Sequence, residues 1–110
     1  MTIDILYFEG CPHHLPTRER ISALLREECC EAEVREVEVP DAATAVRMKF
    51  PGSPTVRVNG VDIEPEAADG YGFGLMCRRY PGGIPSDVLI RTAIRLASAP
   101  ASAALGGSAK

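Results

Sequence analysis

Hydrophobic positions along the first half of the chain change from strand-like to helix-like spacing and back. Residues 3–8 are apolar at nearly every position, which is typical of a strand covered on both faces. Residues 12 to about 30 carry apolar side chains every three to four positions, which predicts an amphipathic helix. Residues 34–39 form a β-branched stretch interrupted by charged side chains. This half therefore predicts a β-α-β unit whose second strand is less buried than the first.

The second half begins with a short helix and a hairpin. A proline and an aspartate open an alanine-rich helix over residues 41–48, which Pro51 and Gly52 close. Two short β-branched runs, 55–58 and 61–64, are separated by Asn59-Gly60. Because both residues tolerate positive φ, this dipeptide is the strongest short signal for a two-residue hairpin turn. We therefore expect two antiparallel strands here.

The last third combines a glycine-rich segment, a helix and a tail. Residues 65–83 are rich in glycine and predict a long loop. Ser86 is a suitable cap for an amphipathic helix that follows it. Residues 98–110 are almost entirely small, so we expect a disordered tail behind a single domain of residues 1–97. The order β-α-β-α-β-β-α predicts a three-layer α/β/α fold around a four-stranded mixed sheet.

Composition narrows the classes of partner. Hydrophobic residues make up 45% and charged residues 25% of the 110 positions, as in an ordinary globular domain. A net charge of −3 argues against nucleic acid or an anionic membrane as the main partner. Neither a membrane-spanning apolar run nor a signal-peptide pattern is visible. We therefore expect a cytoplasmic protein, in which the four cysteines are more often thiols than disulfides.

Cys11 occupies the most informative place in this pattern, the predicted turn from strand to helix. The residues around it read Gly10-Cys11-Pro12-His13-His14. Unpaired N–H groups at a helix N-terminus stabilise a thiolate over a thiol, and imidazolium side chains would add to that effect. The pattern favours a nucleophilic cysteine. The alternative is a buried, unreactive cysteine in a loop.

Two motifs together resemble the thioredoxin/glutaredoxin superfamily. They are the strand–Cys-x-x-His–helix motif at Cys11 and the tripeptide Ser53-Pro54-Thr55 entering a hairpin. More narrowly, Gly10-Cys11-Pro12 and the later run Gly74 to Arg78 resemble small thioredoxin-like proteins labelled alkylmercury-lyase-like. The resemblance implies a thioredoxin-like fold with Cys11 as the nucleophile.

The resemblance also implies a substrate-binding segment around a cis-proline. Pro54 matches the superfamily's cis-proline, which lies across from the active cysteine. Ser53 would offer its backbone N–H and C=O to an extended thiol substrate, with Pro12 and Thr55 completing the set. The alternative is an ordinary trans proline at the start of a strand.

His14 marks a departure from the dithiol members, whose second cysteine stands at this position. Cys11 therefore cannot close the usual short disulfide, and we expect monothiol chemistry. A mixed disulfide would be resolved by glutathione or another low-molecular-weight thiol, or by Cys77 in the predicted loop. His13 or His14 would tune the thiolate, unless both are merely solvated. Cys77 could instead fill a small apolar site with its neighbours.

The remaining cysteines and one acid have simpler expected roles. Cys29 is expected to lie near the apolar face of the first helix, with Cys30 pointing outward. Both should lie far from Cys11, because a helix of about 18 residues is roughly 27 Å long. Asp4, within the first strand, is either a buried acid beneath the active site or a solvated residue at the strand end.

Three functions remain open from the sequence. The first is a monothiol oxidoreductase that needs no resident cofactor and acts on a thiol or disulfide, small molecule or protein. The second is a protein that handles soft metals or organomercurials through Cys11 and Cys77. The third is a thioredoxin-like domain that has lost its chemistry and only binds a partner.

Overall fold

The computed structural model describes residues 1–66 and 72–98. Its elements are β1 (Thr2–Tyr7), α1 (His14–Glu27), β2 (Glu33–Glu38), α2 (Ala42–Arg47), β3 (Thr55–Val58), β4 (Val61–Asp62) and α4 (Asp87–Ser98). Among the described residues this is the element order that the sequence predicts, except that Pro65 and Glu66, expected in the long loop, are helical. The predicted disorder of residues 99–110 and part of the predicted loop, residues 67–71, lie outside the described residues. Ser98, expected in the tail, is the last residue of α4.

The sheet is mixed and four-stranded, as predicted, with the order β2-β1-β3-β4. β1 is parallel to β2 and antiparallel to β3, and β4 is antiparallel to β3. Asn59 and Gly60 both have positive φ, 51° and 84°. Positive φ at both central residues is what a primed two-residue hairpin requires, so the hairpin prediction is confirmed.

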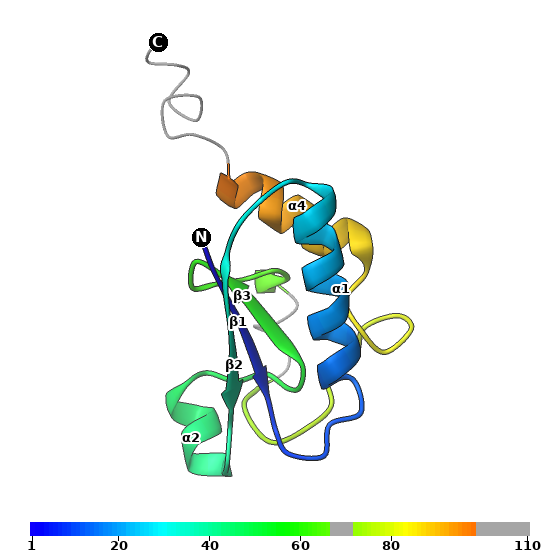
Figure 1. Cartoon of the computed structure of the whole chain (residues 1–110). Coiled ribbons are helices and arrows are strands. Elements are labelled where there is room, and N and C mark those ends of the chain that lie inside the picture. The colour runs from blue at the N-terminus through cyan, green and yellow to red at the C-terminus, as the bar shows by residue number, and fades with distance from the viewer. Residues whose placement is uncertain (67–71, 99–110) are drawn as a thin grey trace.

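Helices cover both faces of the sheet, giving the expected α/β/α layers (Figure 1). On one face, side chains of β1 and β3 pack against α1 and α4. This core consists of Ile3, Ile5, Ile21, Leu24, Leu25, Val56, Val58, Ile90 and Ile94. On the other face, Leu6 of β1 packs with Val39, Ala45 and Phe50 in and around α2. The two faces follow from the alternation of side chains along β1.

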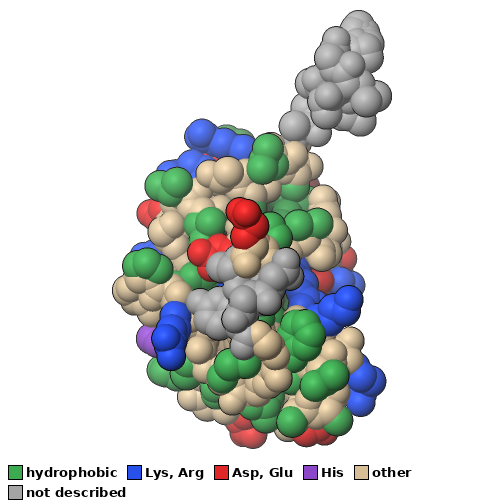
Figure 2. Space-filling view, turned by 180° about the vertical axis from the view of Figure 1, so that it is seen from behind, with side chains coloured by type: hydrophobic (Ala, Val, Ile, Leu, Met, Phe, Trp, Pro, Cys, Tyr) green, Lys and Arg blue, Asp and Glu red, His purple; other side chains and the backbone are tan. Residues whose placement is uncertain are grey.

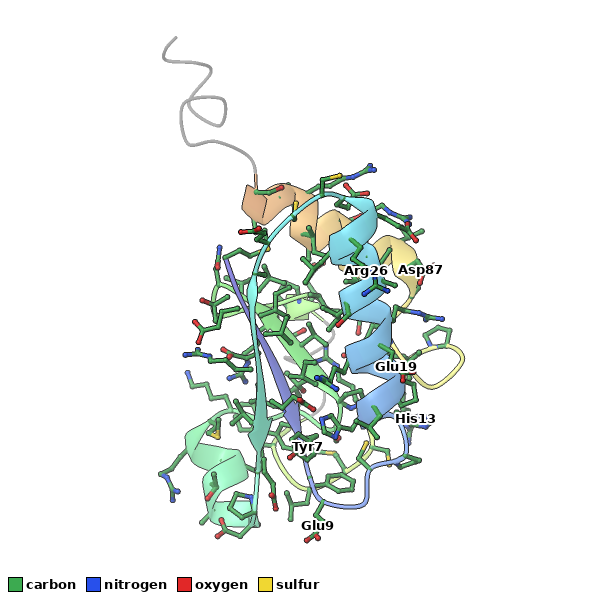
Figure 3. The ribbon with its side chains drawn as sticks, in the orientation of Figure 1. Tyr7, Glu9, His13, Glu19, Arg26 and Asp87 are labelled. Carbon is green, nitrogen blue, oxygen red and sulfur yellow. The ribbon has the colours of Figure 1, made fainter. Side chains whose placement is uncertain are left out.

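The strand directions bring three connections to one edge of the sheet. β1 and β2 end there, and β3 begins there, since Leu6 is paired with Thr55 and the Val39 N–H donates to the Tyr7 carbonyl at 2.7 Å. The turn into α1 starts from the same edge. Figure 3 shows Tyr7, Glu9 and His13 at this end and Arg26 towards the other end of α1. The residues singled out by the sequence are therefore concentrated at one edge.

α1 begins two residues later and ends about three residues earlier than the pattern indicates. Turn hydrogen bonds occupy the residues before it, with the Cys11 N–H donating to the Phe8 carbonyl (3.2 Å) and the His14 N–H to the Cys11 carbonyl (3.4 Å). At the other end, Cys29 adopts a φ of +53°, which stops the helix. The expected order of the two adjacent thiols is therefore reversed: Cys29 is exposed, whereas Cys30 packs against the core.

Candidate functional site

Cys11 lies in the turn between β1 and α1 and is half-buried. The N-cap of α1 is His13, two residues further on, and no side chain caps the helix. Among the described residues, the Cys11 thiol takes part in no hydrogen bond and no disulfide. A thiol placed just ahead of an uncapped helix N-terminus is exposed to the positive end of the helix dipole. This placement is compatible with the nucleophilic role expected for Cys11.

His14 is held at the β2 side of the edge. Its ring stacks on Tyr7, with centroids 3.7 Å apart and planes 9° from parallel. Its Nε2 lies 2.6 Å from a Glu36 oxygen, in an ion-pair contact without hydrogen-bond alignment. The other Glu36 oxygen lies 3.1 Å from Arg18 Nε. The predicted tuning of Cys11 by this imidazole stays a prediction, because the structure shows no side-chain hydrogen bond between the two.

His13 is packed against the segment that leads into α4. A Cβ placed on Gly83 would lie 2.8 Å from His13 Cε1, so only glycine allows this contact. Gly83 also has a φ of +92°, in the region that glycine prefers. The approach is reinforced by Arg20 of α1, whose guanidinium donates to the Pro85 carbonyl (2.8 Å) and pairs with Asp87 (2.9 Å). The His13 ring is therefore packed against the segment before α4 and is not merely solvated.

The Ser53-Pro54 peptide bond is cis, as the resemblance predicts. Ser53, Pro54 and Thr55 are all buried. Because Thr55 is paired with Leu6, this tripeptide lies beside the end of β1, from which the chain continues into the Cys11 turn. Pro12, by contrast, is exposed in that turn. The structure thus brings the predicted substrate-binding residues and Cys11 to the same edge.

The backbone of Ser53 is already paired with another part of this chain. Its N–H donates to the Met76 carbonyl at 2.8 Å, and its carbonyl accepts from the Arg78 N–H at 2.9 Å. These two bonds form a parallel bridge between Ser53 and Cys77. The groups expected to receive an extended substrate are therefore occupied by backbone groups of residues 76 and 78 in this structure.

We call residues 72–80, which supply this bridge, the strap. The Gly74 N–H donates to the Phe50 carbonyl (3.1 Å), and the Tyr80 hydroxyl donates to the Pro54 carbonyl (3.0 Å). A Cβ on Gly52 would lie 3.1 Å from the Arg78 nitrogen and the Met76 oxygen, so glycine is needed for this close backbone approach. The strap, which belongs to the predicted long loop, thus docks along the segment Ser53–Thr55, called here the proline segment. The strap is the yellow-green segment in Figure 1.

Arg78 is the main anchor of the strap. Its side chain is buried and donates to both Asp62 oxygens, at 2.7 and 2.8 Å. It also lies 3.3 Å from Glu64 Oε1 and packs over the Tyr80 ring at 5.0 Å. Burial alone would lower the pKa of Arg78, but the hydrogen bonds and charge of Asp62 outweigh it and raise that pKa above the ordinary guanidinium value. The sequence places Arg78 only within the predicted loop and does not predict its anchoring role.

Cys77 lies at the centre of the bridge with Ser53, and it is exposed. The Ser53 hydroxyl is buried and has no hydrogen-bond partner in the described part of the chain. Cys77 thus lies beside the segment Ser53–Thr55, and Cys11 lies in the turn that leaves the same edge of the sheet. Over residues 1–66 and 72–98, no group of three or more His, Cys, Asp or Glu side chains is arranged to hold a metal ion.

Searches against known protein families, curated proteins and solved structures gave no significant match. Functional inference for this chain therefore depends on its own geometry.

Asp4 belongs to the opposite face of the sheet from the main core. Its carboxylate accepts from Arg35 of β2 at 2.7 and 3.1 Å, across the paired strands. Because Asp4 and Leu6 point to the same side of β1, Asp4 faces the α2 layer and not α1. The structure thus gives this acid a cross-strand ion pair.

One further surface feature is an apolar pocket. This pocket of about 410 Å³ separates the β3–β4 hairpin from α4, and its lining includes Val58, Ile63 and Leu96. Seen from behind, the molecule shows apolar side chains interspersed with charged ones (Figure 2). No helix within the described residues is long and apolar enough to cross a membrane.

Proposed function

We propose that this protein carries out thiol–disulfide exchange through Cys11, with Cys77 as the internal resolving thiol. The proposal is supported above all by the bridge that pairs Cys77 with Ser53, beside the sheet edge from which the Cys11 turn leaves. Membership of the thioredoxin-like superfamily is part of the same proposal. It is supported by the order of elements, the mixed sheet and the position of Cys11 before α1.

The reaction divides into two exchanges. The Cys11 thiolate attacks one sulfur of a disulfide RSSR, an S–S bond forms between Cys11 and RS, and the other RS⁻ leaves. The Cys77 thiolate then attacks Cys11 Sγ, and the second RS⁻ leaves as a Cys11–Cys77 disulfide forms. The balance is one disulfide reduced and one dithiol oxidised. Glutathione or another low-molecular-weight thiol reduces the protein again, in a reducing compartment such as the cytoplasm.

The other named residues assist this chemistry. His13, the N-cap, and His14, the first residue of α1, follow Cys11 closely in the sequence, and their imidazoles assist the formation of its thiolate. Pro54 and Thr55 fix the strap and the end of β1 relative to each other through their backbone and side-chain contacts. Pro12 is exposed beside Cys11, where it contacts an arriving disulfide.

The test uses the reduced protein and bis(2-hydroxyethyl) disulfide at neutral pH, with disulfides mapped by mass spectrometry. We expect a Cys11–Cys77 disulfide and the release of both mercaptoethanol molecules. Cys77→Ser should stop at a mixed disulfide on Cys11, whereas the control Cys29→Ser should behave like the wild type. Absence of any modification at Cys11 would overturn the proposal and leave a binding role.

A further inference from the structure

The strap occupies the position at which an incoming strand would pair with Ser53. Both backbone groups of Ser53 are bonded to residues 76 and 78, at 2.8 and 2.9 Å. An incoming polypeptide would gain hydrogen bonds at Ser53 only by breaking those of the strap. One set of bonds would replace another, so strand addition offers little net gain there.

The strap is also fixed by contacts that a competing strand cannot supply. Its displacement would pull Arg78 away from Asp62 and Glu64, leaving two partly buried carboxylates without this cation. It would also break the hydrogen bond from the Tyr80 hydroxyl to the Pro54 carbonyl. The position at Ser53 is therefore closed to an extended chain by several independent contacts.

We propose that the strap excludes extended polypeptides and confines Cys11 to low-molecular-weight disulfides, an inference that rests on the proposed function. A small disulfide needs no backbone pairing, because exchange requires only the approach of the thiolate along the S–S axis. The exposed Cys77 covers Ser53 at the point where the cysteine of a bound polypeptide would lie. The chain thus provides its own cysteine in place of the second thiol of a protein substrate.

Two probes that share the mercaptoethanol group test this inference on the full-length protein. One is bis(2-hydroxyethyl) disulfide, and the other is a short unstructured peptide whose central cysteine carries a mercaptoethanol mixed disulfide. Rates at Cys11 are divided by those of N-acetylcysteine amide with each probe. We expect this normalised rate to be at least about tenfold higher for the small disulfide.

Gly52→Ala is the variant that releases the strap, because its Cβ would lie 3.1 Å from the strap backbone. It should reduce the preference for the small disulfide several-fold. Gly60→Ala is the matched control: Gly60 also has positive φ, but a Cβ there meets no atom within 4 Å. This control should retain the wild-type preference.

The outcomes separate the inference from the proposed function. Reaction of wild-type Cys11 with neither probe would overturn the proposed function itself. Equal normalised rates with both probes would overturn the exclusion by the strap and leave thiol–disulfide exchange standing. If Gly52→Ala does not fold, amide exchange in the wild type decides the same point. We expect the Ser53 and Arg78 amides to be protected, and rapid exchange of both would contradict a fixed strap.

Discussion

At the scale of single residues, Arg78 links the sequence neighbourhood of Cys77 to the body of the fold. Its guanidinium donates to both Asp62 oxygens in β4, and its backbone N–H donates to Ser53. Arg78 thus anchors the strap through its side chain and pairs it with Ser53 through its backbone. This explains why a glycine-rich stretch docks in a defined position.

Arg78→Met should lower the free energy of unfolding by about 3–5 kcal/mol, because Asp62 would lose the cation that compensates its partly buried charge. Arg26→Met is the control at an exposed arginine in the last turn of α1, and its effect should be no more than about 1 kcal/mol. Urea denaturation followed by circular dichroism measures both. Equal effects of the two changes would refute the anchoring role of Arg78.

Ser53→Ala and Thr55→Val test the polar groups of the proline segment. The Ser53 hydroxyl is buried without a partner, so its removal should change stability by less than about 1 kcal/mol. The Thr55 hydroxyl donates to the Gly52 carbonyl and accepts from Arg78, so Thr55→Val should cost about 1–3 kcal/mol. Thermal unfolding of the two variants gives the comparison, and a larger loss for Ser53→Ala would contradict this assignment.

At the scale of elements, α1 and α4 are joined by ion pairs as well as by the core. Glu28, just after α1, accepts from Arg95 of α4 at 2.8 and 3.1 Å, and Arg91 lies 3.4 Å away. The hydrogen bonds from Arg95 are the largest cause that lowers the pKa of Glu28 from 4.5. Desolvation, the next largest, opposes them, and the charges of Arg95 and Arg91 lower the pKa further. Acid should therefore loosen this contact between the helices.

The lowered pKa of Glu28 predicts how the effect of Glu28→Gln on stability depends on pH. A carboxyl whose pKa is lower in the folded state stabilises the protein at any pH above its unfolded-state pKa, here 4.5. This stabilisation is lost as the pH falls through the folded-state pKa. The stability difference between wild type and Glu28→Gln should therefore be constant above about pH 5.5 and shrink below pH 4.5. Glu31→Gln is the control, an exposed carboxyl without an ion pair among the described residues. A difference that does not change with pH would show that Glu28 acts through packing.

Local signals in the sequence predict the elements but not every boundary. The Asn59-Gly60 turn and the alternating strands follow from backbone preferences of a few adjacent residues. Cys29 and Cys30 show where this reasoning fails. Their expected exposure assumes that the helix continues, whereas Cys29 leaves helical geometry at a φ of +53°. A projection around a helix axis no longer applies once the helix has ended.

At the scale of the whole molecule, the site depends on contacts between distant segments. The sequence identifies Cys11, Pro54 and Cys77 separately, and the strand directions bring the first two to one edge. The docking of the strap on Ser53 leaves no periodic signal, because it joins residues 23 to 25 positions apart through backbone groups that every sequence possesses. The ion pair of Arg78 with Asp62 is likewise one of many pairings that the charges allow. These two features could be identified only from the structure.

The reactivity of Cys11 is the central claim, and Cys29 provides an internal standard for it. The two cysteines lie beyond opposite ends of α1, Cys11 before its N-terminus and the exposed Cys29 after its C-terminus. The measurement is the rate of alkylation by iodoacetamide at neutral pH, resolved by site with mass spectrometry. The helix dipole favours the thiolate at Cys11 and disfavours it at Cys29, so Cys11 should react at least about tenfold faster although it is less exposed. Equal or slower alkylation of Cys11 would contradict a nucleophilic role and leave the chain with a binding role.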